Sequence, residues 1–211
     1  MEKRRIFVAG STGSVGRTVV RLAEEGGDDV IAHRRPKGGS EAPPNAAVFE
    51  LGDKAALGEA LEGVTTVIQL IGTMRKRFAA GDTYETSDIG TTRQLVEAAR
   101  ASAVDHFILL SSVGAGRPMG AYLKAKAEAE RLVRDSGIVY TIFRPSFFDG
   151  EGHKAPPGAA LVTNWLRLER YRPIAVETLA AAILACGRER APLNRVLEGG
   201  PLWDWVEQSS R

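Results

Sequence analysis

The chain has 211 residues, of which 44% are hydrophobic and 26% charged, and its formal net charge is +2. This length suits one domain with its own core, and the small net charge gives no electrostatic reason to expect nucleic acid or an anionic membrane as a partner. The single cysteine, Cys186, excludes an intrachain disulfide and suits a reducing compartment. No apolar run reaches the ~18 residues of a membrane-spanning helix, so we expect a cytoplasmic protein.

Short apolar runs alternate with amphipathic segments through the first two thirds of the chain. The expected strands are residues 5–9, 29–32, 47–51, 65–71, 105–110 and 139–143. The expected helices are residues 14–25, 54–62, 84–101 and 121–136. Because the strands are almost wholly apolar and alternate with helical patterns, the sequence predicts an α/β fold with a Rossmann-like, doubly wound parallel sheet.

The pattern is less regular after about residue 146. We expect a helix over residues 176–186 and a last strand over residues 195–197. Residues 146–172 and the tail are predicted to form a small cap on the same core. Since no linker interrupts the chain, residues 1–211 are predicted to form a single domain.

Three glycines, Gly10, Gly13 and Gly16, stand three residues apart between the first strand and the first helix. A tight strand-to-helix turn needs the backbone freedom of glycine, and the helix start presents N–H groups and a partial positive charge to a phosphate. The sequence therefore predicts a dinucleotide-binding turn; the alternative is a purely structural turn. The other members of this turn, also expected beside the cofactor, are Ser11, Thr12, Ser14 and Val15.

The end of the second strand reads Ala32-His33-Arg34-Arg35 and contains no acidic residue. An acid there would hold the ribose 2′-hydroxyl of NAD, whereas a guanidinium suits the 2′-phosphate of NADP. We therefore expect NADP(H) in preference to NAD(H), held by Arg34 or Arg35, with two solvated arginines as the alternative. Asp53, after the third strand, is expected either to lie near the adenine or to cap the next helix.

Tyr122 and Lys126 are four residues apart on an expected helix, so their side chains point to the same face. A nearby ammonium favours the phenolate, which would make the tyrosine a general acid or base for a carbonyl or an alcohol. Ser112 ends the fifth strand, where ligands bind in such sheets, and could hydrogen-bond the same substrate oxygen. The alternative is an ordinary surface pair of Tyr and Lys.

Four motifs together resemble the atypical short-chain dehydrogenases/reductases: Gly10-x-x-Gly13-x-x-Gly16, Leu110-Ser111-Ser112, Tyr122-x-x-x-Lys126 and Arg144-Pro145. The segment from Ile71 to Glu128 is similar to the NmrA-like and Tat-interacting-protein-like subgroup. The resemblance implies a Rossmann fold with NADP(H). It also implies Ser112, Tyr122 and Lys126 as the catalytic set, with Lys126 touching the nicotinamide ribose. The other residues that it implies beside the cofactor are Ile71, Gly72, Thr73 and Pro145. Asp88 stands near the place where many relatives have an asparagine.

Two functions remain open at this point. The first is an NADP(H)-dependent oxidoreductase acting on a small carbonyl, alcohol or quinone-like substrate, with the cap on the substrate side and Tyr122 as proton donor. The second is a regulatory protein that senses NADP(H) and reports to a protein partner. The three histidines show no metal-ligand spacing, so we expect no metal. The substrate and the choice between monomer and homodimer stay open.

Overall fold

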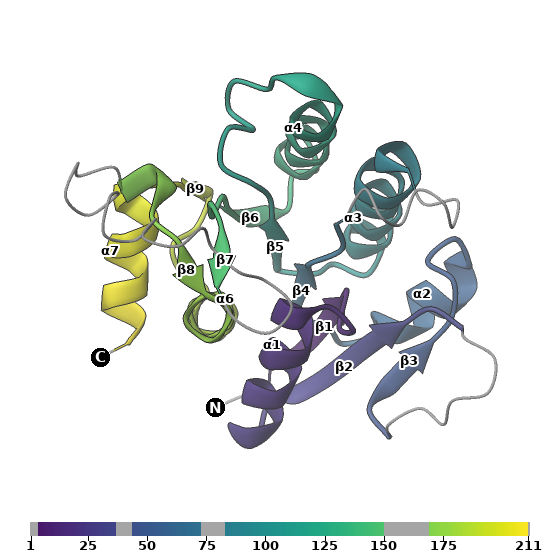
Figure 1. Cartoon of the computed structure of the whole chain (residues 1–211). Coiled ribbons are helices and arrows are strands. Elements are labelled where there is room, and N and C mark those ends of the chain that lie inside the picture. Colours follow the sequence, from purple (N-terminus) through teal and green to yellow (C-terminus); the bar gives the residue numbers. More distant parts are fainter. Residues whose placement is uncertain (1–3, 37–43, 73–82, 150–168, 211) are drawn as a thin grey trace.

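The computed structural model describes residues 4–36, 44–72, 83–149 and 169–210. At its centre lies a seven-stranded parallel sheet in the order β3-β2-β1-β4-β5-β6-β9, and the strand order reverses between β1 and β4 (Figure 1). The strands are β1 (Arg5–Ala9), β2 (Asp29–Arg34), β3 (Ala46–Val48), β4 (Thr66–Gln69), β5 (His106–Leu110), β6 (Val139–Phe143) and β9 (Arg195–Leu197). The predicted doubly wound α/β fold is confirmed.

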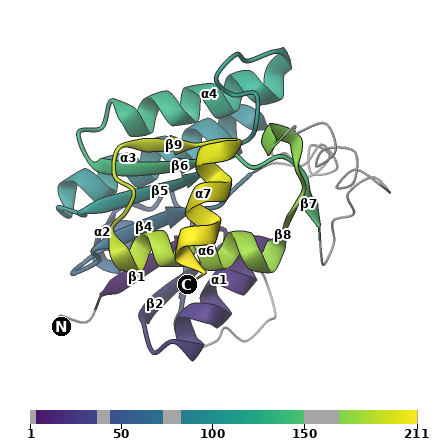
Figure 2. The same cartoon turned by 90° about the vertical axis from the view of Figure 1, so that its left-hand side faces the viewer.

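Helices cover both faces of this sheet. On one face lie α1 (Ser14–Glu25) and α6 (Val176–Glu189), with α7 (Gly200–Ser209) packed against α6 (Figure 2). On the other face lie α2 (Lys54–Ala60), α3 (Thr91–Ala101) and α4 (Gly120–Arg134). None of the helices in the described part of the chain is long and apolar enough to cross a membrane.

Successive side chains along a strand point to opposite faces of the sheet and pack into two separate hydrophobic cores, one on each face. In β1, Ile6 and Val8 pack with α1 and α6, whereas Phe7 and Ala9 pack with α2 and α3. All four side chains are fully buried, as expected for a parallel strand covered on both faces. The almost wholly apolar runs in the sequence therefore reflect burial on both faces of the sheet.

The structure differs from the predicted elements in two places. The helix expected over residues 84–101 is divided into a π-helical segment, η2 (Glu85–Gly90), followed by α3. The tail, predicted as part of a cap, includes the helix α7, which buries Leu202, Trp205 and Val206. The Trp205 indole N–H donates to the Ala182 carbonyl at 2.9 Å, so α7 belongs to the helical layer over α6.

Two short strands, β7 (Phe148–Asp149) and β8 (Ile174–Ala175), pair with each other outside the main sheet, and a 3-10 turn, η3 (Glu169–Tyr171), precedes β8. Most of the predicted cap between residues 146 and 172 lies outside the described residues. The single-domain organisation and the cap therefore stay predictions.

Candidate active site at the carboxyl edge of the sheet

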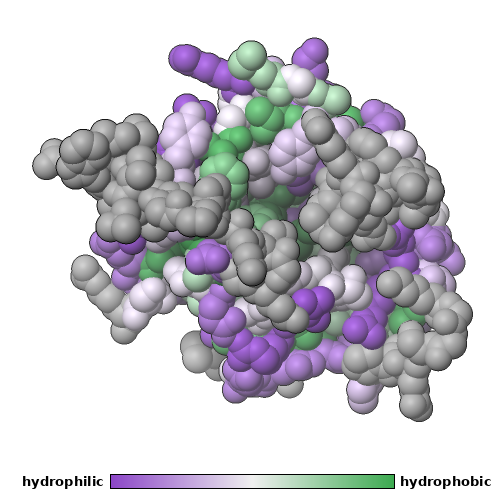
Figure 3. All heavy atoms as spheres, in the orientation of Figure 1, coloured by the Kyte–Doolittle hydropathy of each residue, from purple (hydrophilic) through white to green (hydrophobic). Residues whose placement is uncertain are grey.

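Figure 1 looks onto the carboxyl ends of the parallel strands, which is the edge where ligands bind in doubly wound sheets. In Figure 3, apolar side chains are visible in the recessed middle of this face. The glycine turn (residues 10–16) follows β1, Ile71 and Gly72 follow β4, and Ser112 follows β5. The fold therefore brings residues from distant parts of the sequence to one edge.

The glycine turn has no room for side chains at two positions. Gly10 has a φ of +89°, and a Cβ atom there would lie 2.8 Å from the carbonyl carbon of Leu70. A Cβ atom on Gly16 would lie 2.1 Å from the carbonyl oxygen of Gly10. The N–H of Gly13 closes the turn on that same oxygen at 3.0 Å, and α1 then begins without a side-chain cap. No side chain caps the first backbone N–H groups of α1, and these groups carry the positive end of the helix dipole. Such a helix start suits a pyrophosphate group.

Ser11 has a structural task that the sequence did not reveal. Its side chain is buried, and its hydroxyl donates to the carbonyl of His33 at 2.6 Å, which ties the glycine turn to the end of β2. Any contact of Ser11 with a cofactor is therefore left to its backbone. Thr12 is exposed, whereas Val15 is buried in the core beneath the turn.

The end of β2 separates the two candidate arginines. Val30 packs in the core with α1, and residues two apart on a strand share a face, so Arg34 lies on the α1 side. Arg35 follows the strand and is exposed. His33 points to the opposite face, where its Nε2 lies 2.9 Å from the carbonyl oxygen of Phe49 and burial lowers its pKa. The alternation therefore favours Arg34 over Arg35 as the residue near the glycine turn.

Asp53 caps α2. Its Oδ1 accepts hydrogen bonds from the backbone N–H groups of Ala55 and Ala56, both at 3.1 Å. The capping interpretation is confirmed, and the adenine contact stays a prediction.

Lys126 makes a buried ion pair with Asp88. Its Nζ lies 2.9 Å from Asp88 Oδ1, and the two side chains are 6% and 0% exposed. The same ammonium donates to the carbonyl of Leu110, at the end of β5, at 3.3 Å. Burial alone would lower the pKa of Lys126, but the charge of Asp88, with smaller contributions from Tyr122 and Glu130, raises it above its ordinary value. Lys126 is therefore a fixed positive charge.

The Lys126–Asp88 pair borders the end of β4. A Cβ atom on Gly72 would lie 3.3 Å from the Lys126 Nζ, so the backbone after β4 passes directly beside the ammonium. The fully buried Gln69 accepts a hydrogen bond from the Ile71 N–H at 3.1 Å, which fixes this backbone. Sequence reasoning missed Gln69, although a polar residue within an apolar strand was the available signal. Thr73, the third residue predicted here, lies outside the described residues.

Tyr122 and Ser112 are less tightly held. Tyr122 lies in the first turn of α4, 36% exposed, with its ring centroid 5.6 Å from that of Tyr84. The Ser112 hydroxyl makes only a long contact of 3.4 Å to the Val113 carbonyl. Within the part of the chain that the structure describes, Tyr122 makes no hydrogen bond to Ser112 or Lys126. The predicted catalytic set thus has one rigid member and two adjustable hydroxyl groups.

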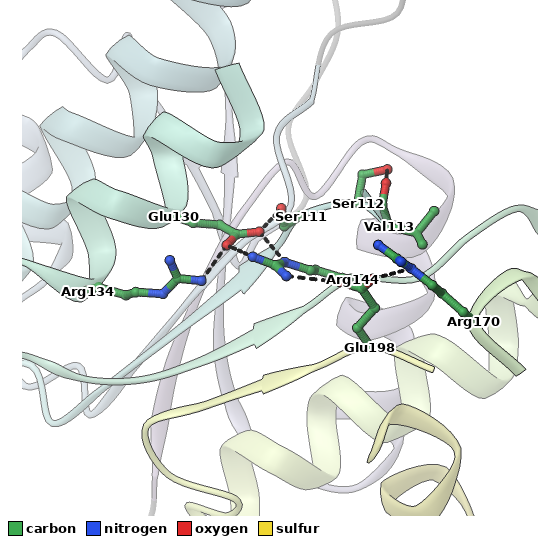
Figure 4. Close-up of polar contacts among 8 residues, drawn as sticks. All are labelled: Ser111, Ser112, Val113, Glu130, Arg134, Arg144, Arg170 and Glu198. Atoms are coloured by element: carbon green, nitrogen blue, oxygen red, sulfur yellow. Dashed lines mark hydrogen bonds and ion pairs between the residues drawn. The ribbon is translucent and has the colours of Figure 1, made fainter. Parts of the chain in front are cut away.

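A buried ionic cluster connects α4 to the ends of β5, β6 and β9 (Figure 4). We call it the Glu130 network; its members are Glu130, Ser111, Arg134, Arg144 and Glu198. Glu130 is fully buried, and Arg144 binds both of its oxygens, at 2.7 and 2.5 Å. Arg134 and the Ser111 hydroxyl also donate to it, at 2.6 and 2.5 Å. Because Ser111 is committed to Glu130, Ser112 is the serine of this pair that remains for a ligand. Sequence reasoning missed Glu130, which lies four residues after Lys126 on α4.

Pro145 links this network to the loop after Ser112. It is buried, and its carbonyl accepts the Val113 N–H at 2.9 Å. The described residues contain no group of His, Cys, Asp or Glu side chains that could hold a metal ion. Burial raises the pKa of the Cys186 thiol to about 12, as suits a packed, unreactive side chain.

A family model described as NAD(P)H-binding matches residues 10–189. Among curated proteins, the chloroplastic divinyl chlorophyllide a 8-vinyl-reductase of Oryza sativa subsp. indica is 28% identical over 219 residues, covering 93% of this chain and 54% of the relative. The (4-alkanoyl-5-oxo-2,5-dihydrofuran-3-yl)methyl phosphate reductase of Streptomyces griseus is 33% identical over 158 residues, covering 72% of this chain and 51% of the relative. The chain therefore spans about half the length of these two relatives.

Among solved structures, the NADPH-dependent quinone oxidoreductase QOR2 of Escherichia coli, complexed with NADPH, has a TM-score of 0.67 to this structure at 20% identity. The match covers 98% of this chain and 76% of that chain. At this level of identity, the likeness concerns the fold alone.

Proposed function

Because the chain belongs to the NAD(P)H-binding family, as the resemblance to atypical short-chain dehydrogenases/reductases predicted, we propose that it is an NADP(H)-dependent oxidoreductase. Its substrate is a small carbonyl, alcohol or quinone-like molecule, reduced or oxidised at the Ser112, Tyr122 and Lys126 site. The observation that carries the proposal is the position of Lys126. Its ammonium lies at the ends of β4 and β5, beside the Gly72 backbone and one helical turn from Tyr122.

The glycine turn and Arg34 support the cofactor part of this proposal. The turn suits a pyrophosphate because α1 begins there without a side-chain cap, so its first backbone N–H groups are left for a ligand. Arg34 is the basic residue on the α1 side of β2, suited to a 2′-phosphate. Asp28 and Asp29 stand at the start of β2, at the opposite edge of the sheet, where neither can hold a ribose hydroxyl.

At the other end of the cofactor, each catalytic residue has a separate task. The Lys126 ammonium, held by Asp88, binds the nicotinamide ribose and provides positive charge next to Tyr122. Tyr122 donates its phenolic proton to the substrate oxygen during reduction. The Ser112 hydroxyl hydrogen-bonds the same oxygen. When bound, NADPH supplies the hydride.

Tyr122→Phe tests the mechanism. We expect it to lower NADPH oxidation with a panel of aldehydes and quinones by about 100-fold or more, since general acid catalysis contributes about 10²–10⁴-fold. NADPH affinity, measured by fluorescence titration, should not change. Tyr84→Phe is the matched control because it removes a hydroxyl from the other ring of the same pair. Full activity in Tyr122→Phe would contradict the proposed role.

One observation favours the second candidate, a cytoplasmic NADP(H) sensor with a protein partner. Lys126 is engaged by Asp88 and Leu110, and in the described residues Tyr122 makes no hydrogen bond to it. A sensor needs the ion pair for cofactor binding but has no need of proton transfer. Tight NADPH binding without turnover of any substrate in the panel would support the sensor and reject the oxidoreductase.

A further inference from the structure

Beyond Ser112, the carboxyl edge opens into a hollow of about 430 Å³ that the proposed chemistry does not use. It is bordered by the loop after β5, the end of β6, the turn η3 and the end of β9. Three arginines line it, Arg117, Arg144 and Arg170, against one acid, Glu198. The three strand ends place it on the side of β5 that lies away from the glycine turn.

Internal pairing accounts for only part of the charge around this hollow. Glu198 is bound at both oxygens, by Arg144 Nη1 at 2.9 Å and by Arg170 Nε at 2.5 Å. The other nitrogens of the Arg144 guanidinium bind Glu130. Glu198 is therefore a bridge that fixes two guanidinium groups in the wall, and the lining keeps a surplus of positive charge.

Arg117 is the cation of this wall that remains available. It is exposed on the loop five residues after Ser112, its backbone N–H is fixed on the Gly114 carbonyl at 3.0 Å, and its side chain has no ion pair with any described residue. Gly116, next to it, leaves space for the Arg144 side chain, because a Cβ atom there would lie 2.7 Å from Arg144 Nη1. The loop is thus shaped to bring Arg117 and Arg144 into one wall.

Apolar side chains occupy the surrounding segments. Exposed large hydrophobic residues follow the three lining arginines within five positions in the sequence. They are Met119 and Tyr122 after Arg117, Phe147 after Arg144, and Tyr171 after Arg170. A ligand suited to this region combines an apolar body with an anionic group.

We propose that this hollow is the anion-binding subsite for the substrate, and that Arg117 and Arg170 hold a carboxylate or phosphate group on an aromatic or alkyl body whose reactive carbon lies toward Ser112. The inference rests on the proposed function only in calling this ligand the substrate. Guanidinium groups bind both anions through paired, charge-assisted hydrogen bonds.

Calorimetric titration of the whole chain saturated with NADP⁺, which blocks the glycine turn, tests the subsite without turnover. The probes are benzoate, phenyl phosphate and the uncharged benzyl alcohol. We expect at least one anion to bind about 10-fold more tightly than benzyl alcohol, and which anion does so distinguishes a carboxylate ligand from a phosphate ligand. Arg117→Met should remove this advantage, and Arg170→Met should reduce it.

Arg195→Met is the matched control. It removes the same charge from an exposed arginine at the start of β9, away from the hollow, and should leave the three affinities unchanged. Equal affinities for all probes, or equal losses in Arg117→Met and Arg195→Met, would overturn the subsite. The Arg117 variant should keep the fold because, among the described residues, the Arg117 side chain has no ion-pair partner to lose.

Turnover of 4-carboxybenzaldehyde against benzaldehyde separates this inference from the proposed function. A preference of about 10-fold in kcat/KM for the charged aldehyde, lost in Arg117→Met, supports both. Anion binding without turnover of either aldehyde leaves the subsite and rejects the oxidoreductase. Turnover without any preference for charge, together with equal probe affinities, retains the oxidoreductase and rejects the subsite.

Discussion

The two halves of the carboxyl edge are held by different forces. The glycine turn after β1 is fixed by contact distances that exclude every side chain at Gly10 and Gly16. The Glu130 network beyond β5 is fixed by charge, with Arg144 binding both Glu130 and Glu198, the latter 54 positions away. The glycine turn should therefore be sensitive to added atoms, whereas the Glu130 network should be sensitive to the loss of a charge even when no atom is added.

Gly16→Ala should have the largest effect, because its Cβ would lie 2.1 Å from a backbone oxygen that cannot move freely. We expect a loss of about 3 kcal/mol or more in the free energy of unfolding, measured by urea denaturation. Gly58→Ala in α2 meets nothing within 4 Å and should stabilise the chain by about 0.5–1 kcal/mol. Equal effects of the two variants on the free energy of unfolding would contradict the claim that steric exclusion fixes the glycine turn.

Glu130→Gln should cost almost as much, although it adds no atom. The change leaves the largely buried Arg144 without its main counter-charge, and breaking a buried pair costs about 3–5 kcal/mol, less what the amide retains. Glu128→Gln is the control on the same helix, because Glu128 pairs with the exposed Arg131 and should contribute less than about 1 kcal/mol. Similar unfolding free energies for both variants would show that burial of the charge is unimportant.

Burial lowers the pKa of both His33 and His106, and the larger shift belongs to His106, so we expect acid sensitivity mainly there, at the opposite edge of the sheet. Burial, followed by the charges of Arg190 and Arg4, lowers its pKa from 6.5 to about 4, so the unfolded chain binds this proton at a higher pH than the fold. Stability from this residue is therefore complete above pH 6.5 and falls by about 3 kcal/mol as the pH drops to about 4. His106→Gln should remove this part of the pH dependence, measured by denaturation from pH 7 to 4. An unchanged pH dependence would show that His106 is not the source of the acid sensitivity.

The smallest effect is expected from Arg34→Ala. We expect its NADPH affinity to fall about 10-fold, with NADH affinity unchanged and a weaker effect from Arg35→Ala, since one charge-assisted contact with the 2′-phosphate is lost. Fluorescence titration of both nucleotides measures this. Equal losses for NADPH and NADH would reject the preference for NADP(H).

The part of the molecule set by local patterns could be predicted from the sequence. Apolar runs indicated every strand of the main sheet, and the spacing of Gly10, Gly13 and Gly16 located the turn because its geometry depends on neighbours in the chain. The helix α7 was missed, although Leu202, Trp205 and Val206 have helical spacing.

Interactions between distant residues could not be predicted. Nothing in the pattern of β4 shows that Gln69 holds both the Ile71 backbone and the Thr91 side chain. The ion pair between Asp88 and Lys126 joins two residues that are 38 positions apart and lie on different elements. The i to i+4 spacing that indicated the pair of Tyr122 and Lys126 holds within one helix, so it could not predict this contact. Such pairs depend on the packing of α4 against η2, which follows only from the complete fold.

The hydrogen bond from Ser11 to the carbonyl of His33 has a consequence for engineering and for evolution. This bond fixes the backbone of β2 at His33, near the end of the strand. The side chain of the next residue, Arg34, can therefore change without shifting the strand. If Arg34 holds the 2′-phosphate as we propose, a new side chain at position 34 should change the nucleotide preference while the backbone of β2 keeps its position.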